Sequence, residues 1–436
     1  MFSRNGKISE KQMRRMLVLP AFASCIFVLP YLSAKLYGEN VCSGLIVFLL
    51  LAGIYTGCIY GLGAWCQKRW VGEDENEKCV PGNLGLAEVF ESTGFGGKIL
   101  AFIQLVRMLL RLAFYIILSV KILGEAQVPF MQEGDSANAM NLLVVLPLLL
   151  VALYGAAQGN RAGSSPSDKK GTSFETSVEK QGRIHEMIFW VLYVPFIIMI
   201  LFGLKEVDYS IFVPRFTMPI GTLLLYSYAL LTFILPVENY LYLRPALRRN
   251  RLVKERNTDI EEDNGELKKR KNHVWISYGA VWFVIALSVV LSLFMLGIYG
   301  IRGAGNEEMV TIAIMRYIRL PFGVLERFDV LMVWFFMTGC FLLICGTLFY
   351  AGSLLKILCG RIKRIWLLLT ALVLALLAVV LLPGYGQTLL LFLCYGAILD
   401  IPLSLLIPLL GMGLSETHLK NRKNQPKDKK PKGEQV

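Results

Sequence analysis

Long apolar segments without charged residues alternate with short polar segments along the 436-residue chain. A bilayer core about 30 Å thick needs roughly 20 apolar residues of helix, and most of these segments are about that length or longer. The last, 365–399, is too long for one crossing and is divided by the turn sequence Pro383-Gly384-Tyr385-Gly386. The pattern therefore predicts an all-α integral membrane protein with ten transmembrane helices: 16–34, 41–67, 99–123, 136–160, 187–204, 216–237, 272–301, 330–355 and the two that the turn separates.

Two of these predicted helices contain a proline in a similar apolar context, Pro30 in the first and Pro236 in the sixth. The prolines lie 206 positions apart, and the same offset from Leu204, where the fifth helix ends, reaches the end of the tenth near 410. Interrupted helices at matching places in two halves are typical of inverted-repeat transporters. We therefore expect a five-plus-five inverted repeat with discontinuous spans 1 and 6, although simple kinks in packed helices also explain both prolines.

Basic residues are distributed unevenly across the predicted membrane. Of the 45 Lys and Arg residues, 35 lie before the first helix, in the loops on that side or in the tail, which places both termini in the cytoplasm. The first repeat then covers 1–204, with a cytoplasmic insertion at 160–180, and the second covers 205–414. A basic tail follows at 415–436. These segments set the topology, and docking to anionic lipid or to a partner subunit is an additional hypothesis.

Composition excludes several classes of protein. Hydrophobic residues make up 55% of the chain and charged residues 18%, which excludes intrinsic disorder and argues against a soluble enzyme. The net charge of +13 follows from membrane sidedness, so we expect the lipid bilayer as a partner and no nucleic acid. The nine cysteines form no CxxC pair and the three histidines lie outside the apolar runs, which predicts neither a metal site nor a disulfide framework. Catalytic and nucleotide-binding motifs are missing, so we expect no enzyme and no cofactor.

Two arginines lie well inside the third predicted span. Arg107 and Arg111 are one helical turn apart and share a face, too deep to reach the interface easily. Acidic partners exist in the sixth and tenth spans, and we expect the pairs Arg111–Asp400 and Arg107–Glu238. Such a network either fixes helix packing, captures an anionic ligand group or couples charge to a proton.

The interrupted helices and the arginine face supply candidate ligand contacts. Hydroxyl groups in membrane helices more often bond a helix carbonyl than a ligand, so each is a hypothesis. The candidates are Ser24, Cys25, Ile26, Arg111, Tyr115, Ser227, Tyr228 and Thr232.

The predicted outer surface has two further features. Glu326 and Asp329 form a candidate outer gate at the start of span 8, or else mark the end of that helix. Residues 310–318 have helical apolar spacing, which favours a short surface helix that could serve as a lid.

Three short sequences lie at or near the starts of predicted spans. The first is Ile8-Ser9-Glu10-Lys11-Gln12, followed by Leu29-Pro30 in span 1. The second, Arg183-Ile184-His185-Glu186-Met187-Ile188-Phe189-Trp190, begins span 5. The third is Glu326-Arg327-Phe328-Asp329-Val330-Leu331, followed by Trp334 in span 8. Taken in order, they resemble the endospore germination permeases, the B subunits of nutrient germinant receptors in the amino acid–polyamine–organocation superfamily.

The resemblance implies a LeuT-type fold, a ligand pocket between spans 1, 3, 6 and 8, and assembly with A-type and C-type receptor subunits in the spore inner membrane. We accordingly expect a permease-like subunit that binds a small, amino acid-like nutrient and signals germination. Relatives usually have glycines where span 1 unwinds, whereas 21–27 contain none. A stand-alone proton-coupled transporter of amino acids or cations, or a membrane scaffold without a pocket, remain the alternatives.

Overall fold

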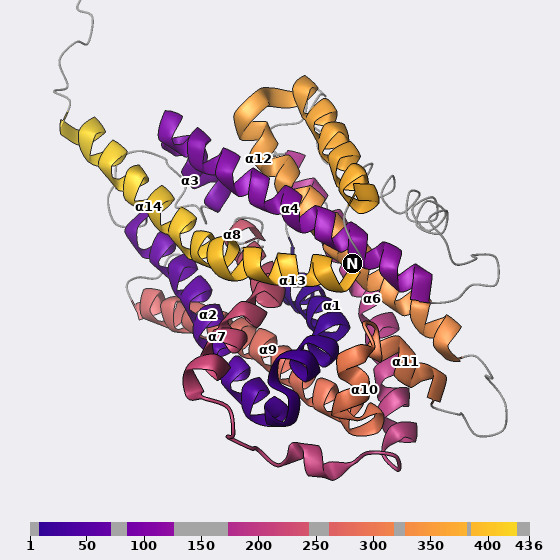
Figure 1. Cartoon of the computed structure of the whole chain (residues 1–436). Helices are drawn as coiled ribbons and strands as arrows, with labels where there is room; N and C mark the ends of the chain where they lie inside the picture. Colours follow the sequence, from indigo (N-terminus) through magenta and orange to yellow (C-terminus); the bar gives the residue numbers. More distant parts are fainter. Residues whose placement is uncertain are drawn as a thin grey trace, which may run out of the picture.

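The computed structural model describes residues 8–70, 85–125, 173–243, 261–317, 328–381 and 385–424, and most of these residues are helical. This part of the chain contains no strand (Figure 1). Its helices, in order, are α1 (Glu10–Tyr37), η1 (Gly38–Asn40), α2 (Val41–Trp70), α3 (Leu86–Ser92), α4 (Phe95–Glu125), α6 (Ser173–Gly203), η2 (Tyr209–Phe212), α7 (Ile220–Leu230), η3 (Leu231–Asn239), α8 (Tyr240–Leu243), α9 (Glu261–Tyr299), α10 (Ile301–Asn306), α11 (Val310–Tyr317), α12 (Phe328–Leu381), α13 (Tyr385–Tyr395), η6 (Gly396–Asp400) and α14 (Ile401–Asn424).

Helix α1 is the centre of the bundle, and every residue from 16 to 34 is buried. It begins with a capping box, in which the Ser9 hydroxyl accepts from the Gln12 backbone N–H and the Gln12 side chain accepts from the Ser9 N–H. It ends at Gly38, whose φ of 53° glycine adopts at little cost. The helix is continuous through both of its prolines, so the predicted discontinuity of span 1 is wrong.

Span 6 leaves the α-helical conformation, as predicted. Helix α7 gives way to the 3₁₀-helical η3, which contains Pro236, and a single turn, α8, follows. Proline has no N–H to donate, and a 3₁₀ segment inside a longer helix often marks a hinge or a strained site.

The last two helical regions differ from simple spans. Helix α12 stays helical through 356–364, where spans 8 and 9 were expected to separate, and Figure 1 shows it bending sharply so that its C-terminal part turns back. Span 10 consists of α13, a single π-helical turn (η6) and α14. Single π turns inside helices are rare and occur frequently at functional sites.

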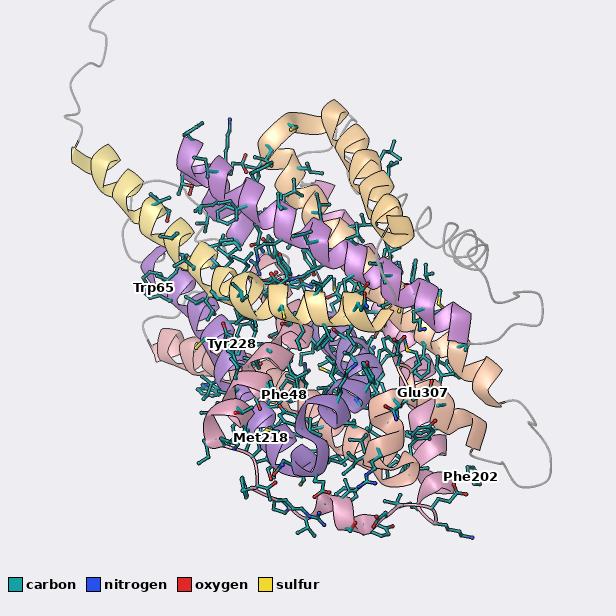
Figure 2. All side chains as sticks on the ribbon, viewed as in Figure 1. Phe48, Trp65, Phe202, Met218, Tyr228 and Glu307 are labelled. Carbon is teal, nitrogen blue, oxygen red and sulfur yellow. The ribbon has the colours of Figure 1, made fainter. Side chains whose placement is uncertain are left out.

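The exposed surface of the bundle is apolar. On α4 and α6 the exposed large side chains recur every three or four residues: Phe95, Ile99, Phe102, Val106 and Leu110, and Met187, Trp190, Val194, Ile197 and Leu201. Such rows suit contact with lipid chains, while the interior is filled by side chains such as Phe48 (Figure 2).

Six stretches of the described chain are long and apolar enough to cross a membrane, the first of which, Glu10–Trp65, includes both α1 and α2. The chain is therefore a multi-pass membrane protein. Span 4, expected at 136–160, lies outside the described residues. The number ten and the inverted repeat thus stay predictions.

Candidate functional site

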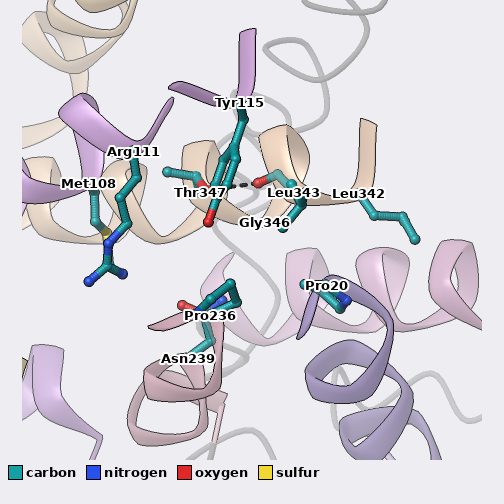
Figure 3. Close-up of a pocket in the computed structure, with 10 residues that line it drawn as sticks. All are labelled: Pro20, Met108, Arg111, Tyr115, Pro236, Asn239, Leu342, Leu343, Gly346 and Thr347. Atoms are coloured by element: carbon teal, nitrogen blue, oxygen red, sulfur yellow. Dashed lines mark hydrogen bonds between the residues drawn. The ribbon is translucent and has the colours of Figure 1, made fainter. Parts of the chain in front are cut away.

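A small cavity lies between α1, α4, η3 and α12, which correspond to spans 1, 3, 6 and 8. Its volume is about 10 Å³, which is room for about one water molecule. Its walls are formed by Pro20, Met108, Arg111, Tyr115, Pro236, Asn239, Leu342, Leu343, Gly346 and Thr347 (Figure 3).

Two helix prolines line this cavity, Pro20 of α1 and Pro236 of η3. Each removes one backbone donor from its helix, so a carbonyl on the preceding turn loses its usual partner. The proline matched to Pro236 by sequence offset was Pro30, which is not among the cavity walls. The carbonyl that Pro30 leaves free, that of Ile26, instead accepts a hydrogen bond from the Thr311 hydroxyl of α11 at 3.1 Å.

Four charged side chains form a closed network beside the cavity. The Asp400 carboxylate accepts from Arg107 Nε (2.7 Å), Arg111 Nε (2.7 Å) and Arg111 Nη2 (2.8 Å). The Glu238 carboxylate accepts from Arg107 Nη2 (3.1 Å) and Arg111 Nη1 (2.5 Å). Gln104 bridges the two sides, since its Oε1 accepts from Arg107 Nη1 and its Nε2 donates to Glu238. Both expected pairs are thus present, together with both crossed pairs.

The network is buried and electrically balanced. The four side chains are at most 5% exposed, and two positive charges face two negative ones. Removing one partner of such a set leaves an uncompensated buried charge, which typically costs about 3–5 kcal/mol. Arg111 alone among the four lines the cavity, and it uses only three of its five N–H groups within the described structure.

Asp400 is the last residue of the π turn, which lies next to span 6. Gly396 opens this turn, and a Cβ atom there would overlap the Thr232 side chain, so only glycine fits without movement. Thr232 is itself held by a bond from its hydroxyl to the Ala229 carbonyl at 2.7 Å. The close approach of η6 to η3 brings Asp400 and Glu238 to the same two arginines.

The remaining predicted ligand residues lie away from the cavity. Ser227 bonds the Tyr37 hydroxyl (2.8 Å) and the Gly44 carbonyl (3.1 Å), and Thr232 bonds its own helix. Tyr228 is half-buried on the side of the bundle near α2 (Figure 2). Among the described residues, only Arg111 and Tyr115 of the predicted set line the cavity; Ser24, Cys25 and Ile26 are buried in α1 without reaching it.

The predicted outer gate is only partly described. Glu326 lies outside the described residues, and Asp329 lies in the first turn of α12 with its side chain undescribed. Ion pairs join segments of the chain near both ends of the bundle. Glu308 accepts from Lys121 (2.9 Å) and from the Gly386 backbone N–H (3.0 Å), while Arg15 pairs with Glu186 (2.6 Å) at the other end.

Several cavity residues were missed from the sequence. Pro20 was visible as a second proline in span 1, and Gly346-Thr347 as a small polar pair in an apolar helix. Asn239 carried no pattern, because its place at the cavity depends on the 3₁₀ segment that ends with it.

The described helices define an all-α multi-pass membrane protein with a small cavity between four of its helices, and comparison with solved structures identifies its fold. A manganese transporter from Eremococcus coleocola, crystallised with an aromatic bis-isothiourea substituted compound, has a TM-score of 0.50 at 12% identity, covering 94% of this chain and 77% of that one. A mutant of the same transporter, in which one histidine is replaced by alanine, also has a TM-score of 0.50, at 13% identity and the same coverage. At these identities the likeness shows the fold alone, which is the LeuT-type transporter fold.

A sequence family also matches. Residues 265–383, about a quarter of the chain, match the family model described as spore germination protein. The predicted resemblance to the spore germination permeases is therefore confirmed. No match was found among curated proteins.

Proposed function

We propose that this chain is the permease-like subunit of a spore germinant receptor, and that a small, amino acid-like nutrient binds between α1, α4, η3 and α12. The observation that carries the proposal is the cavity between two helix prolines with Arg111 as one wall. The match of residues 265–383 to a spore germination family supports the receptor context. In this role the chain works in the spore inner membrane, with both termini cytoplasmic and with A-type and C-type subunits as partners.

The charges of the site favour a ligand without net charge. Both arginines are already neutralised by Glu238 and Asp400, so a purely anionic ligand would leave one buried negative charge unmatched. A zwitterionic amino acid carries its own balancing positive charge. Its carboxylate can accept hydrogen bonds from the two N–H groups of Arg111 that have no acceptor in the described structure.

Binding requires the cavity to enlarge. The present volume holds about one water, so the compact structure is the ligand-free member of a two-state pair. A nutrient that binds only the expanded state shifts the population towards it by its differential affinity. The two proposed repeats, 1–204 and 205–414, would move relative to each other, and the partner subunits would detect that movement.

The test is a thermal-unfolding screen of the full chain in lipid nanodiscs against a panel of amino acids and sugars. We expect at least one amino acid to raise the unfolding midpoint of the wild type and to lose this effect in R111Q. The matched control is R215Q, because Arg215 is exposed and pairs with Glu39 near the surface. Proton-coupled uptake by the chain alone in vesicles would favour a transporter instead.

The pocketless scaffold is the second candidate, and the cavity volume favours it together with the glycine-free segment 21–27. On this hypothesis no nutrient shifts the unfolding midpoint, while deletion of the gene still prevents assembly of the other subunits. Ligand binding by the purified wild type would exclude it.

A further inference from the structure

Helix α6 presents a polar ridge to α1 and α12 that the charge network does not use. Gln181, His185 and Tyr193 lie at intervals of four and eight residues, on one face of the helix. The neighbouring Gly182 packs against Gln12 and Met16 of α1, and Tyr193 stacks on Phe22 of α1 at 4.8 Å between ring centroids. The ridge therefore lies inside the bundle, on the cytoplasmic half of α1.

The first two groups of this ridge offer acceptors without donors. Gln181 is 7% exposed, and its Oε1 has no hydrogen-bond partner in the described structure. His185 is 1% exposed, and its Nδ1 lies 2.9 Å from the Gln181 carbonyl oxygen. Because a carbonyl only accepts, Nδ1 carries the proton, and Nε2 of the neutral ring is left as a bare acceptor. Buried acceptors without a donor are uncommon and need an explanation.

Gln181 also reaches the wall of the cavity. Its Nε2 lies 3.6 Å from the position that a Cβ atom would take at Gly346, and Gly346 lines the cavity. The amide makes no side-chain hydrogen bond with a described residue, so it is free to turn either atom towards this wall. The absence of a side chain at Gly346 is what brings the amide and the cavity together.

We infer that Gln181 and His185 form an acceptor site for the ammonium group of the ligand, next to the cavity and on its cytoplasmic side. An ammonium group has three donors and no acceptor, which complements two neutral acceptors one helical turn apart. The inference rests on the proposed function and extends it, since the acceptors of α6 bind the ammonium group while Arg111 binds the carboxylate. The helix that carries Glu186, the partner of Arg15, thereby senses the ligand directly.

The experiment measures binding of L-alanine and of propionate, which lacks the ammonium group, to the full chain in nanodiscs. The wild type should bind alanine more tightly than propionate. The variant Q181M keeps the side-chain volume, and we expect it to weaken alanine binding about tenfold, the loss of one hydrogen bond to a charged group. H185F should do the same. The matched control is Q12M, which removes an amide on the facing helix that pairs with Glu186 instead.

A second variant covers the case in which Q181M does not fold. Q181E replaces the amide by a carboxylate with two oxygen acceptors and a negative charge, so it should tighten alanine binding. Unchanged alanine binding in Q181M and H185F overturns the inference while leaving the proposed function intact. Equal affinity of the wild type for alanine and propionate overturns the inference together with the proposed preference for a zwitterion. Binding only to nutrients without an ammonium group also overturns it. If the wild type binds no nutrient, the proposed function fails as well.

Discussion

The Thr311 hydroxyl donates to the Ile26 carbonyl oxygen at 3.1 Å, which is the carbonyl that Pro30 leaves without a donor in α1. Thr311 is 3% exposed and belongs to the short helix α11. A side chain from another helix thus replaces the missing backbone bond, and the central helix continues through a proline without a break.

This relationship predicts a coupling between Thr311 and Pro30. T311V keeps the shape but leaves a buried carbonyl unsatisfied, so we expect a loss of about 1–3 kcal/mol in the free energy of unfolding. In a P30A background the backbone N–H restored at position 30 bonds the Ile26 carbonyl directly, and T311V should then cost little. Denaturant unfolding of the four proteins of this cycle measures the coupling, and equal losses in both backgrounds would contradict it.

The charge network predicts strongly unequal single and double variants. D400N removes the charge that both arginines share, and we expect a loss of about 3–5 kcal/mol because a net positive charge stays buried. R107Q/D400N restores neutrality and leaves the Arg111–Glu238 pair, so part of the loss should return. Additive losses, measured by unfolding in nanodiscs, would show that the four charges act separately.

The contact between η6 and η3 predicts that Gly396 is intolerant of substitution. G396A places a methyl group against the Thr232 side chain, and overpacking of this kind costs about 1–3 kcal/mol. T232A removes the two nearest atoms, so G396A/T232A should be more stable than G396A alone. The control is G221A, because nothing lies within 4 Å of a Cβ atom there. A neutral G396A would falsify the close approach of the two helices.

Tyr115 offers a test of the proposed ligand site that should not affect stability. Its hydroxyl points from α4 towards the cavity (Figure 3) and makes no hydrogen bond with the described residues. We therefore expect Y115F to leave the unfolding midpoint unchanged and to weaken nutrient binding up to about tenfold. The measurement is the ligand-induced shift of the midpoint. Equal shifts in Y115F and the wild type would exclude the hydroxyl from the site.

The Arg15–Glu186 pair predicts that its loss speeds hydrogen exchange at the start of α1 and changes stability little. Both side chains are partly exposed, at 25% and 48%, and screened pairs of this kind contribute at most about 1 kcal/mol. E186Q should leave the unfolding midpoint nearly unchanged and speed hydrogen exchange in the first turns of α1, which the pair holds against α6. Unchanged exchange in E186Q would show that the pair does not restrain this end.

The sequence was most informative where charge or backbone chemistry leaves few choices. Arg107 and Arg111 one turn apart in an apolar helix require acidic partners, and only a few acidic residues lie at membrane depth, so Glu238 and Asp400 followed. Pro236 likewise marked the part of span 6 that leaves the α-helix. The long uncharged segments were sufficient to predict an all-helical membrane fold.

Features that depend on contacts between helices could not be predicted. Both prolines of α1 have the same local effect. Only the packing of other helices decides that Thr311 bonds the carbonyl freed by Pro30, while Pro20 lines the cavity. Ser227 and Thr232 have the composition of ligand residues, but their hydroxyls are occupied by neighbouring groups. The π turn differs from an α-helix by one residue in a turn, which no periodicity over so few residues reveals.

The balance of the four buried charges has an electrical consequence. Moving one elementary charge across a membrane potential changes its energy by about 2.3 kcal/mol per 100 mV. The charges of two arginines and two carboxylates sum to zero, so displacement of the whole cluster through the field does no net electrical work. The cluster itself therefore adds no voltage dependence to a conformational change that carries it across the membrane.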